Sequence, residues 1–183
     1  ALAALLAKNG VIGAEGMFEG PRGFGCDMSH DVDWDGAIAD LEKGFTIASM
    51  TQKNHTCCGH TFAAIDAIIA LASEHGLNAE NVASIHIATY AKGIEICGNR
   101  DPQTVYEAKF SLSYAVAAGL VLGRARLDAF SDEKLNDPAI RSVMSRIKFE
   151  TDPDADAKFP NCRSATVTVE TLDGSRYKHH SPT

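Results

Sequence analysis

The chain has 183 residues, of which 45% are hydrophobic and 22% charged, and its formal net charge is −7. The negative charge argues against nucleic acid or an anionic membrane as a partner, because both favour a basic protein surface. No apolar run reaches the roughly 18 to 20 residues of a membrane span, and the first residues lack the basic flank of a signal peptide, so we expect a cytoplasmic protein. The five cysteines are an odd number in a chain of this size, which favours reduced thiols.

The first part of the chain predicts a helix followed by irregular structure. Residues 1–10 are typical of the last turns of a helix that ends at its glycine. Because this helix starts without a capping residue, we expect that a longer polypeptide has been cut there. Residues 11–30 are rich in glycine and predict a loop or a broken helix. Asp35 is expected to cap a short helix through Glu42 that ends at Gly44.

The middle of the chain predicts a strand, a buried helix and a second strand. Residues 45–50 alternate between apolar and small or polar side chains, as a strand does. Residues 61–75 carry an apolar stripe at helical spacing, and Gly76 stops this helix. Residues 83–90 alternate cleanly, so His86 is expected on the face opposite the core as a solvated histidine.

The last part of the chain predicts two further helices and three strands. Residues 106–123 form the longest helical run and are apolar nearly all round, which places this helix inside a packed layer. Residues 138–147 predict a helix that begins at a proline and is capped by the preceding aspartate, with a strand near residues 148–150. A hairpin with an Asp-Gly turn closes the chain, with strands at residues 165–170 and 175–178.

These elements predict an α+β fold in which helices pack on one face of a mainly antiparallel sheet. We assign this domain to residues 45–183. Residues 1–44 are interpreted as the C-terminal remnant of a separate helical domain and its linker.

The chemically active side chains gather directly before the buried helix. One short stretch holds a lysine, two histidines and two cysteines: Lys53, His55, Cys57, Cys58 and His60. A helix N-terminus presents unpaired N–H groups and a partial positive charge, which favour bound carboxylates and thiolates. We therefore expect the functional centre there.

Several chemistries are compatible with this stretch. The side chains of His55, Cys57, Cys58 and His60 are possible zinc ligands, but adjacent cysteines do not easily face one ion and structural zinc sites draw on separated pairs. Redox chemistry would lack the two-residue spacer of thioredoxin-like sites, and a Cys58 nucleophile would lack an orienting third group. A buried, inert cysteine is the commonest outcome. We expect no metal, and keep a non-catalytic binding or zinc module as an alternative of another class.

Two segments together resemble the MmgE/PrpD family, which includes 2-methylcitrate dehydratase and cis-aconitate decarboxylase. They are the run from Lys53 through Cys58 to Ile65-Asp66-Ala67, and residues 108–117. Residues 3–10 are similar to the family too, as is Phe159-Pro160 followed by Arg163. The resemblance covers nearly the whole chain.

The resemblance implies a large all-helical domain with an inserted α+β lid domain and an active site in the cleft between them. This chain would be the end of one helical stretch plus the lid, and its partners would be the missing helical domain of the same polypeptide, a second copy in a homodimer, and a small polycarboxylate substrate. Activities in the family use no cofactor and no metal. The isolated chain is then expected to be inactive, because half of the cleft is absent.

The resemblance also assigns site residues. Lys53 and Tyr114 match the family's lysine and active-site tyrosine, which suggests carboxylate binding or proton transfer for Lys53 and hydrogen bonding or proton donation for Tyr114. Without the resemblance, a lone lysine is most often a solvated surface group and a helical tyrosine most often belongs to the core. His60 is assigned as a third catalytic residue. The substrate-binding residues are assigned as His55, Cys58 and Lys109.

The chain departs from the family pattern around the helix start. His55 and Thr56 stand where the family usually has an aromatic residue and a proline, and Phe62 replaces a usual histidine, with His60 two residues earlier. The leading interpretation is a 2-methylcitrate dehydratase of propionate metabolism, which removes a proton beside a carboxylate and then loses water. A decarboxylase or epimerase of the same family is the alternative.

Overall fold

The computed structural model describes residues 2–41 and 43–182. It divides into two compact units, Ala1–Thr51 and Gln52–Thr183. The assignment of residues 1–44 to a remnant of a helical domain stays a prediction.

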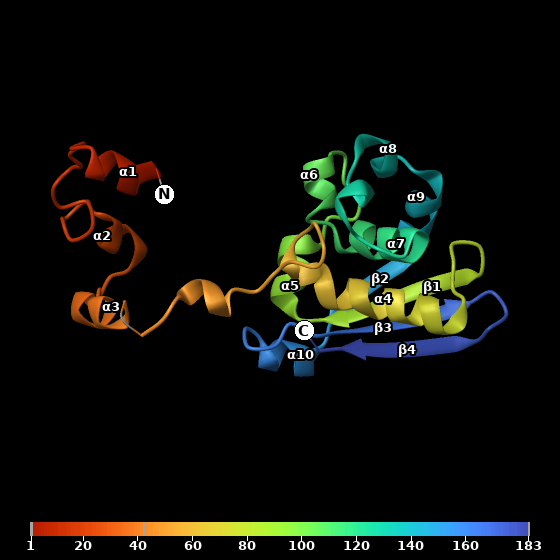
Figure 1. Ribbon diagram of the computed structural model, residues 1–183. Helices are drawn as coiled ribbons and strands as arrows, with labels where there is room; N and C mark the ends of the chain where they lie inside the picture. Colours follow the sequence, from red (N-terminus) through yellow and green to blue (C-terminus); the bar gives the residue numbers. More distant parts are fainter. Residues whose placement is uncertain (1, 42, 183) are drawn as a thin grey trace. The chain divides into compact units, whose positions relative to one another are not determined.

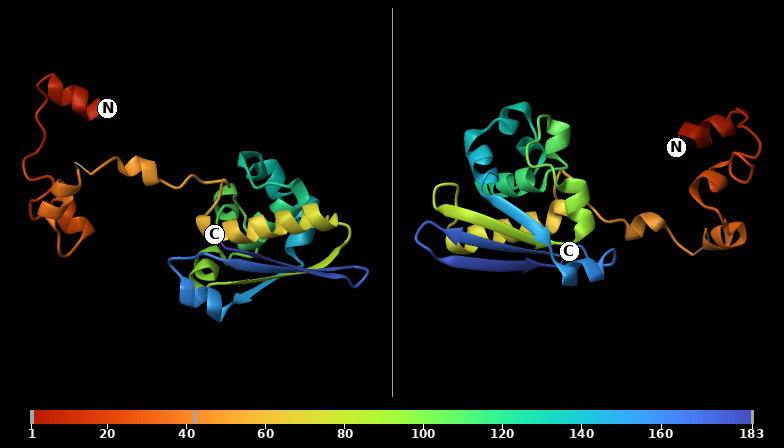
Figure 2. Two further views of the ribbon diagram at one scale, coloured as in Figure 1. Left: turned by 60° about the horizontal axis from the view of Figure 1, so that its bottom comes forward. Right: turned by 180° about the vertical axis from the view of Figure 1, so that it is seen from behind.

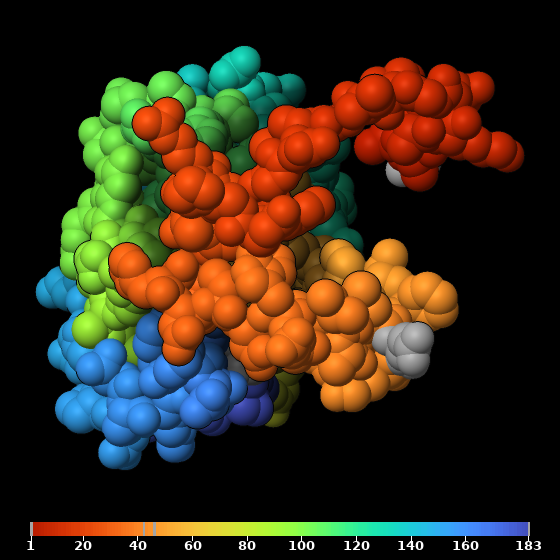
Figure 3. Space-filling view, turned by 90° about the vertical axis from the view of Figure 1, so that its left-hand side faces the viewer, coloured from red at the N-terminus to blue at the C-terminus, as the bar shows by residue number. Residues whose placement is uncertain are grey.

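Unit 1 contains short helices that bury almost no apolar surface. Its helices are α1 (Leu2–Lys8), α2 (Phe24–Met28), α3 (Trp34–Asp40) and the 3-10 helix η1 (Thr46–Ser49). Most of its large apolar side chains are exposed, among them Leu5, Ile12, Phe18, Phe24, Ile38, Phe45 and Ile47. Figure 3 shows this unit, in red to orange, as an extended and branched arrangement rather than a rounded body. The described part of unit 1 therefore has no hydrophobic core of its own.

Two predictions in unit 1 are wrong. The cap of α3 is Asp33, not Asp35, since the Asp33 carboxylate accepts a hydrogen bond of 2.8 Å from the Gly36 amide. The predicted helix end at Glu42 lies outside the described residues. The predicted strand at residues 45–50 is absent, and Thr46–Ser49 form η1 there instead. In the described ranges this segment lies beside no other strand, and a strand needs a neighbour to bond its N–H and C=O groups.

Unit 2 is built on a four-stranded sheet whose strand order is β2-β1-β3-β4 (Figure 1). The strands are β1 (Val82–Thr89), β2 (Ile147–Thr151), β3 (Ala165–Thr171) and β4 (Arg176–Ser181). Strand β2 runs parallel to β1, whereas the β1–β3 and β3–β4 pairs are antiparallel. The predicted α+β fold with a mainly antiparallel sheet is thus confirmed, as is the closing hairpin.

One face of the sheet is covered by helices. Helix α4 (Phe62–His75) lies along this face, and α7 (Leu112–Leu122) packs on α4 (Figure 2). The core forms where apolar side chains of α4, α7, β1 and β3 meet, and it includes Ile65, Ile68, Leu71, Ile85, Ile87, Val116, Val167 and Val169. The predicted helix before Gly76 is confirmed, and Gly76 adopts the left-handed conformation with φ of 65° that ends it. His86 lies on the opposite face, as predicted.

Shorter helices complete unit 2. They are η2 (Gly59–Thr61), α5 (Ala91–Cys97), α6 (Val105–Ala108), η3 (Leu127–Ala129), α8 (Asp132–Leu135), α9 (Pro138–Met144) and α10 (Pro153–Lys158). Asp137 caps α9 as predicted, but α9 ends at Met144 because Ile147 already begins β2.

The long helix predicted over residues 106–123 is two helices, α6 and α7, with a turn between them. Ser111 breaks the run, because its hydroxyl oxygen accepts a hydrogen bond from the Tyr114 amide while its O–H donates to the Asn99 carbonyl. Ser111 also forms an isolated bridge with Gly98. The break matters for the site, because it turns Lys109 and Phe110 out of the helical layer.

Candidate active site

A cavity of about 440 Å³ opens at the start of α4, within unit 2. It is lined by Lys53, His55, Thr56, Cys57, Cys58, Lys109 and Phe110. Four of the predicted site residues, Lys53, His55, Cys58 and Lys109, therefore share one cavity although they come from two separate segments. One wall is the loop before η2, and the other is the turn between α6 and α7.

Backbone hydrogen bonds hold the two walls together. The Cys58 amide donates to the Lys109 carbonyl at 2.9 Å, and the Thr56 amide donates to the Ala125 carbonyl at 3.0 Å. Both bonds join residues far apart in the sequence. The loop that carries His55 is thus tied to the helical layer at two points, which is what a binding site needs for fixed geometry.

The cavity carries positive charge. The side chain of Lys53 is exposed and that of Lys109 is half-buried. None of the ion pairs formed between described residues includes either lysine. Two ammonium groups on one cavity can bind an anion that carries more than one carboxylate.

His55 is the most constrained side chain of the cavity. It is 7% exposed, and its Nε2–H donates to Oδ1 of Asp66 on α4 at 2.8 Å. The edge of its ring meets Phe62, with 5.1 Å between centroids and an angle of 78°. Its Nδ1 is shielded from solvent and has no hydrogen-bond partner among the residues that the structure describes. Sequence reasoning did not identify Asp66 as a partner of His55.

All five cysteines are free thiols, and Cys57 and Cys97 are buried. Cys57 is buried, and burial raises the pKa of its thiol to about 11, although a 3.2 Å contact with the Thr61 hydroxyl opposes this effect. Burial also raises the pKa of the Cys97 thiol, with the neighbouring Cys58 adding to the effect. Because only the thiolate is a good nucleophile or metal ligand, Cys57 is a structural thiol at neutral pH.

His60 lies in a second cluster and does not line the cavity. Its Nδ1 shares a hydrogen bond of 2.6 Å with the hydroxyl of Tyr90, a fully buried residue whose ring stacks on Phe159 at 4.9 Å. Burial, and after it the charges of Arg163 and Lys92, lower the pKa of His60, so the imidazole is neutral at pH 7. Tyr90 carried no signal in the sequence, since it follows a strand as an ordinary core residue would.

Tyr114 lies inside the helical layer. Its side chain is fully buried, and its hydroxyl donates to the Ala129 carbonyl at 2.8 Å. Burial raises the pKa of Tyr114 to about 12. The structure does not bring Tyr114 to the cavity of Lys53, and its contacts are those of a core tyrosine. Its catalytic role stays a prediction, as does that of His60.

Three of the four candidate zinc ligands are bonded to different partners. His55 is bonded to Asp66, His60 to Tyr90, and Cys57 to Thr61. Within residues 2–41 and 43–182, no three His, Cys, Asp or Glu side chains are placed to hold one metal ion. Among the same residues, no helix has both the length and the apolarity that crossing a membrane requires.

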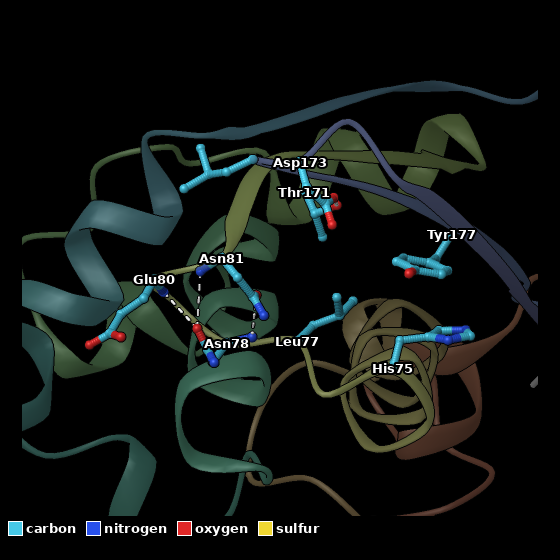
Figure 4. Close-up of a pocket in the computed structure, with 9 residues that line it drawn as sticks. His75, Leu77, Asn78, Glu80, Asn81, Thr171, Asp173 and Tyr177 are labelled. Carbon is cyan, nitrogen blue, oxygen red and sulfur yellow. Dashed lines mark hydrogen bonds between the residues drawn. The ribbon is translucent and has the colours of Figure 1, made fainter.

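A second cavity, of about 360 Å³, lies at the other end of α4 (Figure 4). The side chains of Asn78 and Asp173 in its lining form hydrogen bonds within turns. The Asn78 side-chain oxygen accepts hydrogen bonds from the amides of Glu80 and Asn81, and Asp173 accepts from Thr171 and Ser175. This cavity is therefore explained by the turns that form it.

Unit 2 is thus an α+β domain with a cavity at a helix start that two lysines line. Residues 55–182 match the sequence profile of the MmgE/PrpD C-terminal domain, and Lys53 lies just before this range. The match covers most of the chain, and the protein belongs to the MmgE/PrpD family, as the sequence predicted.

The chain is also similar to cis-aconitate decarboxylase of Mus musculus. The two are 26% identical over 82 residues, which are 45% of this chain and 17% of that enzyme. The similar part thus spans less than a fifth of the relative's length.

Proposed function

We propose that this chain is part of a lyase that acts on small polycarboxylates, with 2-methylcitrate dehydratase as the leading activity. Family membership supports the reaction class. The observation that carries the proposal is the pair Lys53 and Lys109 on one cavity, because two cations can hold the carboxylates of such a substrate.

The reaction requires stabilisation of negative charge. Removing a proton from the carbon beside a carboxylate places a second negative charge on that group. Lys53 and Lys109 are suited to stabilise this charge, and the cavity of about 440 Å³ has the size of a small-molecule site. Burial of one wall, at His55 and Cys57, strengthens these interactions by keeping water away.

The proposed active unit is larger than this chain. We propose that a helical domain of the same polypeptide completes the cleft and that the enzyme is a cytoplasmic homodimer. Turnover should then require the complete polypeptide. Measurable turnover by these 183 residues alone would contradict this part of the proposal.

The test compares lysine variants of the complete polypeptide. Purified enzyme is given 2-methylcitrate or citrate, and the ultraviolet absorbance of the new double bond reports water loss. Lys53→Ala and Lys109→Ala should each lower kcat/KM by about a hundredfold, the usual effect of losing one charge-stabilising donor. Lys158→Ala, on exposed α10, is the matched control and should leave kcat/KM unchanged. Full activity in both cavity variants would refute the proposed role of this cavity.

A decarboxylase is the second candidate, favoured by the similarity to cis-aconitate decarboxylase. The same enzyme is given cis-aconitate, and carbon dioxide release is measured. Release of carbon dioxide without water loss from 2-methylcitrate would replace the dehydratase by the decarboxylase. An epimerase would instead change the optical rotation of a chiral substrate with neither loss.

A further inference from the structure

The pair His55–Asp66 has the geometry of an oriented base. Asp66 accepts the Nε2–H of His55 at 2.8 Å, so the neutral form of this imidazole has its proton on Nε2 and a lone pair on Nδ1. His55 forms part of the cavity wall together with Lys53 and Lys109. The Nδ1 atom is the unusual feature, since it is shielded from water and bonded to no described residue. Buried polar atoms in proteins normally have a partner, and one without a partner beside a cavity points to a ligand group.

We propose that His55 is a catalytic base of the site and that Asp66 is the residue that positions it. This inference rests on the lyase function proposed above and names the group that removes the proton.

Two contacts hold the imidazole, and a backbone bond holds the residue next to it. Asp66 holds Nε2 from the second turn of α4, Phe62 presses against the ring from the first turn, and the adjacent Thr56 amide is bonded to Ala125. A base held in this way loses little conformational entropy when it adopts its reactive geometry. The same arrangement, a carboxylate bonded to one imidazole nitrogen with the other nitrogen left for the reaction, orients histidine bases in other enzymes.

Residues of the cavity can account for every proton that the reaction transfers. Nδ1 of His55 takes the proton from the carbon beside a substrate carboxylate, and the electron pair of that C–H bond moves into the carboxylate, where Lys53 and Lys109 stabilise it. The electron pair then returns to form the carbon–carbon double bond as the C–O bond of the neighbouring hydroxyl breaks. The leaving hydroxide takes a proton from the Lys53 ammonium group and departs as water. His55 afterwards gives its proton to Lys53 through solvent, which restores both residues.

The first experiment follows proton removal itself. The complete polypeptide is incubated with substrate in deuterium oxide, and exchange of the C–H proton is measured together with product formation. His55→Gln, which keeps a polar side chain of similar size, should lower both rates by about a hundredfold or more. His86→Gln is the matched control, because His86 lies 3.5 Å from Glu150 in a histidine–carboxylate pair on the open face of the sheet. It should leave both rates unchanged.

The second experiment measures the NMR signals of the imidazole nitrogens and does not depend on turnover. Nitrogen NMR of the complete polypeptide should show the His55 proton on Nε2. Saturation with tricarballylate, an unreactive tricarboxylate, should shift the Nδ1 signal of His55 and not that of His86. Asp66→Asn should mix the two imidazole tautomers and lower kcat at least tenfold with KM nearly unchanged, whereas Glu150→Gln should do neither. A purely structural role of Asp66 would change the melting temperature but not the tautomer.

The outcomes separate the two proposals. If the unchanged enzyme processes a polycarboxylate and His55→Gln keeps its full proton-exchange rate while remaining folded, the role of His55 is wrong and the lyase function stands. A folded enzyme that processes none of the polycarboxylates refutes the lyase function. In that case an Nδ1 signal that does not respond to bound tricarballylate refutes the inference about His55 as well.

Discussion

At the scale of single residues, burial and hydrogen-bond partners distinguish side chains that the sequence analysis assigned to one site. Lys53, His55, Cys58 and Lys109 share a cavity, whereas His60 is bonded to Tyr90 outside it. Tyr114 lies in the core with its hydroxyl on a carbonyl group. Sequence patterns give residue type and order, but the partner of each polar atom depends on segments far along the chain.

Tyr114 offers a direct test of a buried hydrogen bond. Tyr114→Phe removes the 2.8 Å bond to Ala129 and leaves that carbonyl without its donor, so we expect the free energy of unfolding to fall by about 1 kcal/mol. Urea denaturation followed by circular dichroism measures this change. Tyr106→Phe is the matched control, because Tyr106 is 72% exposed and the substitution should have no effect. Equal stability of the two variants would contradict the role of the Tyr114 hydroxyl.

At the scale of elements, the close approach of α4 and α7 depends on small residues. A Cβ atom on Gly119 would lie 3.2 Å from Cγ2 of Ile68 and 3.4 Å from Cγ2 of Ile65. The apolar composition of residues 106–123 predicted a packed helical layer, and at Gly119 helix α7 closely approaches Ile65 and Ile68 of α4.

Gly119→Val should therefore overpack this interface and destabilise the protein by about 1 to 3 kcal/mol. Gly119→Ala is the graded control. Its single methyl group requires only a small shift, and the better helix propensity of alanine offsets part of that cost. Thermal unfolding should rank the native protein and the alanine variant well above the valine variant. A valine variant as stable as the native protein would show that the two helices can separate freely.

At the scale of the whole molecule, the hydrophobic core belongs to unit 2. All large buried apolar side chains of the described residues lie between Cys57 and Val169, whereas most large apolar side chains of unit 1 are exposed. A fragment of residues 52–183 should therefore fold alone, with a cooperative thermal transition at the same midpoint as the whole chain. Circular dichroism during heating measures both midpoints. A fragment that unfolds without cooperativity would show that unit 1 contributes to the core.

Stability should also fall at high pH. Burial raises the pKa of Cys57 from 9.0 to about 11, and those of Tyr90 and Tyr114 from 10.0 to about 12. The folded chain holds these protons where the unfolded chain releases them, so the stabilising contribution is complete below pH 9 and is lost as pH rises toward 12. Urea midpoints measured across this range should decline steadily. Constant midpoints would mean that these groups are not buried in solution.

The sequence by itself determined the features that depend on local patterns. The apolar stripe before Gly76, the alternation around His86, the Asp137 cap and the Asp-Gly hairpin each follow from the periodicity or conformational preference of neighbouring residues, and the structure confirms them. The family also followed from short motifs in order along the chain, and its profile matches residues 55–182.

Only the tertiary structure decided the features that depend on distant partners. Residues 45–50 have the alternation of a strand but no neighbouring strand among the described residues, and Ser111 interrupts a helical run because it bonds to Asn99 and bridges to Gly98. The cavity depends on the backbone hydrogen bond that joins the loop of Cys58 to Lys109. The carboxylate partner of His55 is Asp66, which lies on α4. Hydrogen bonds between segments far apart in sequence have no period along the chain, so no local pattern could predict them.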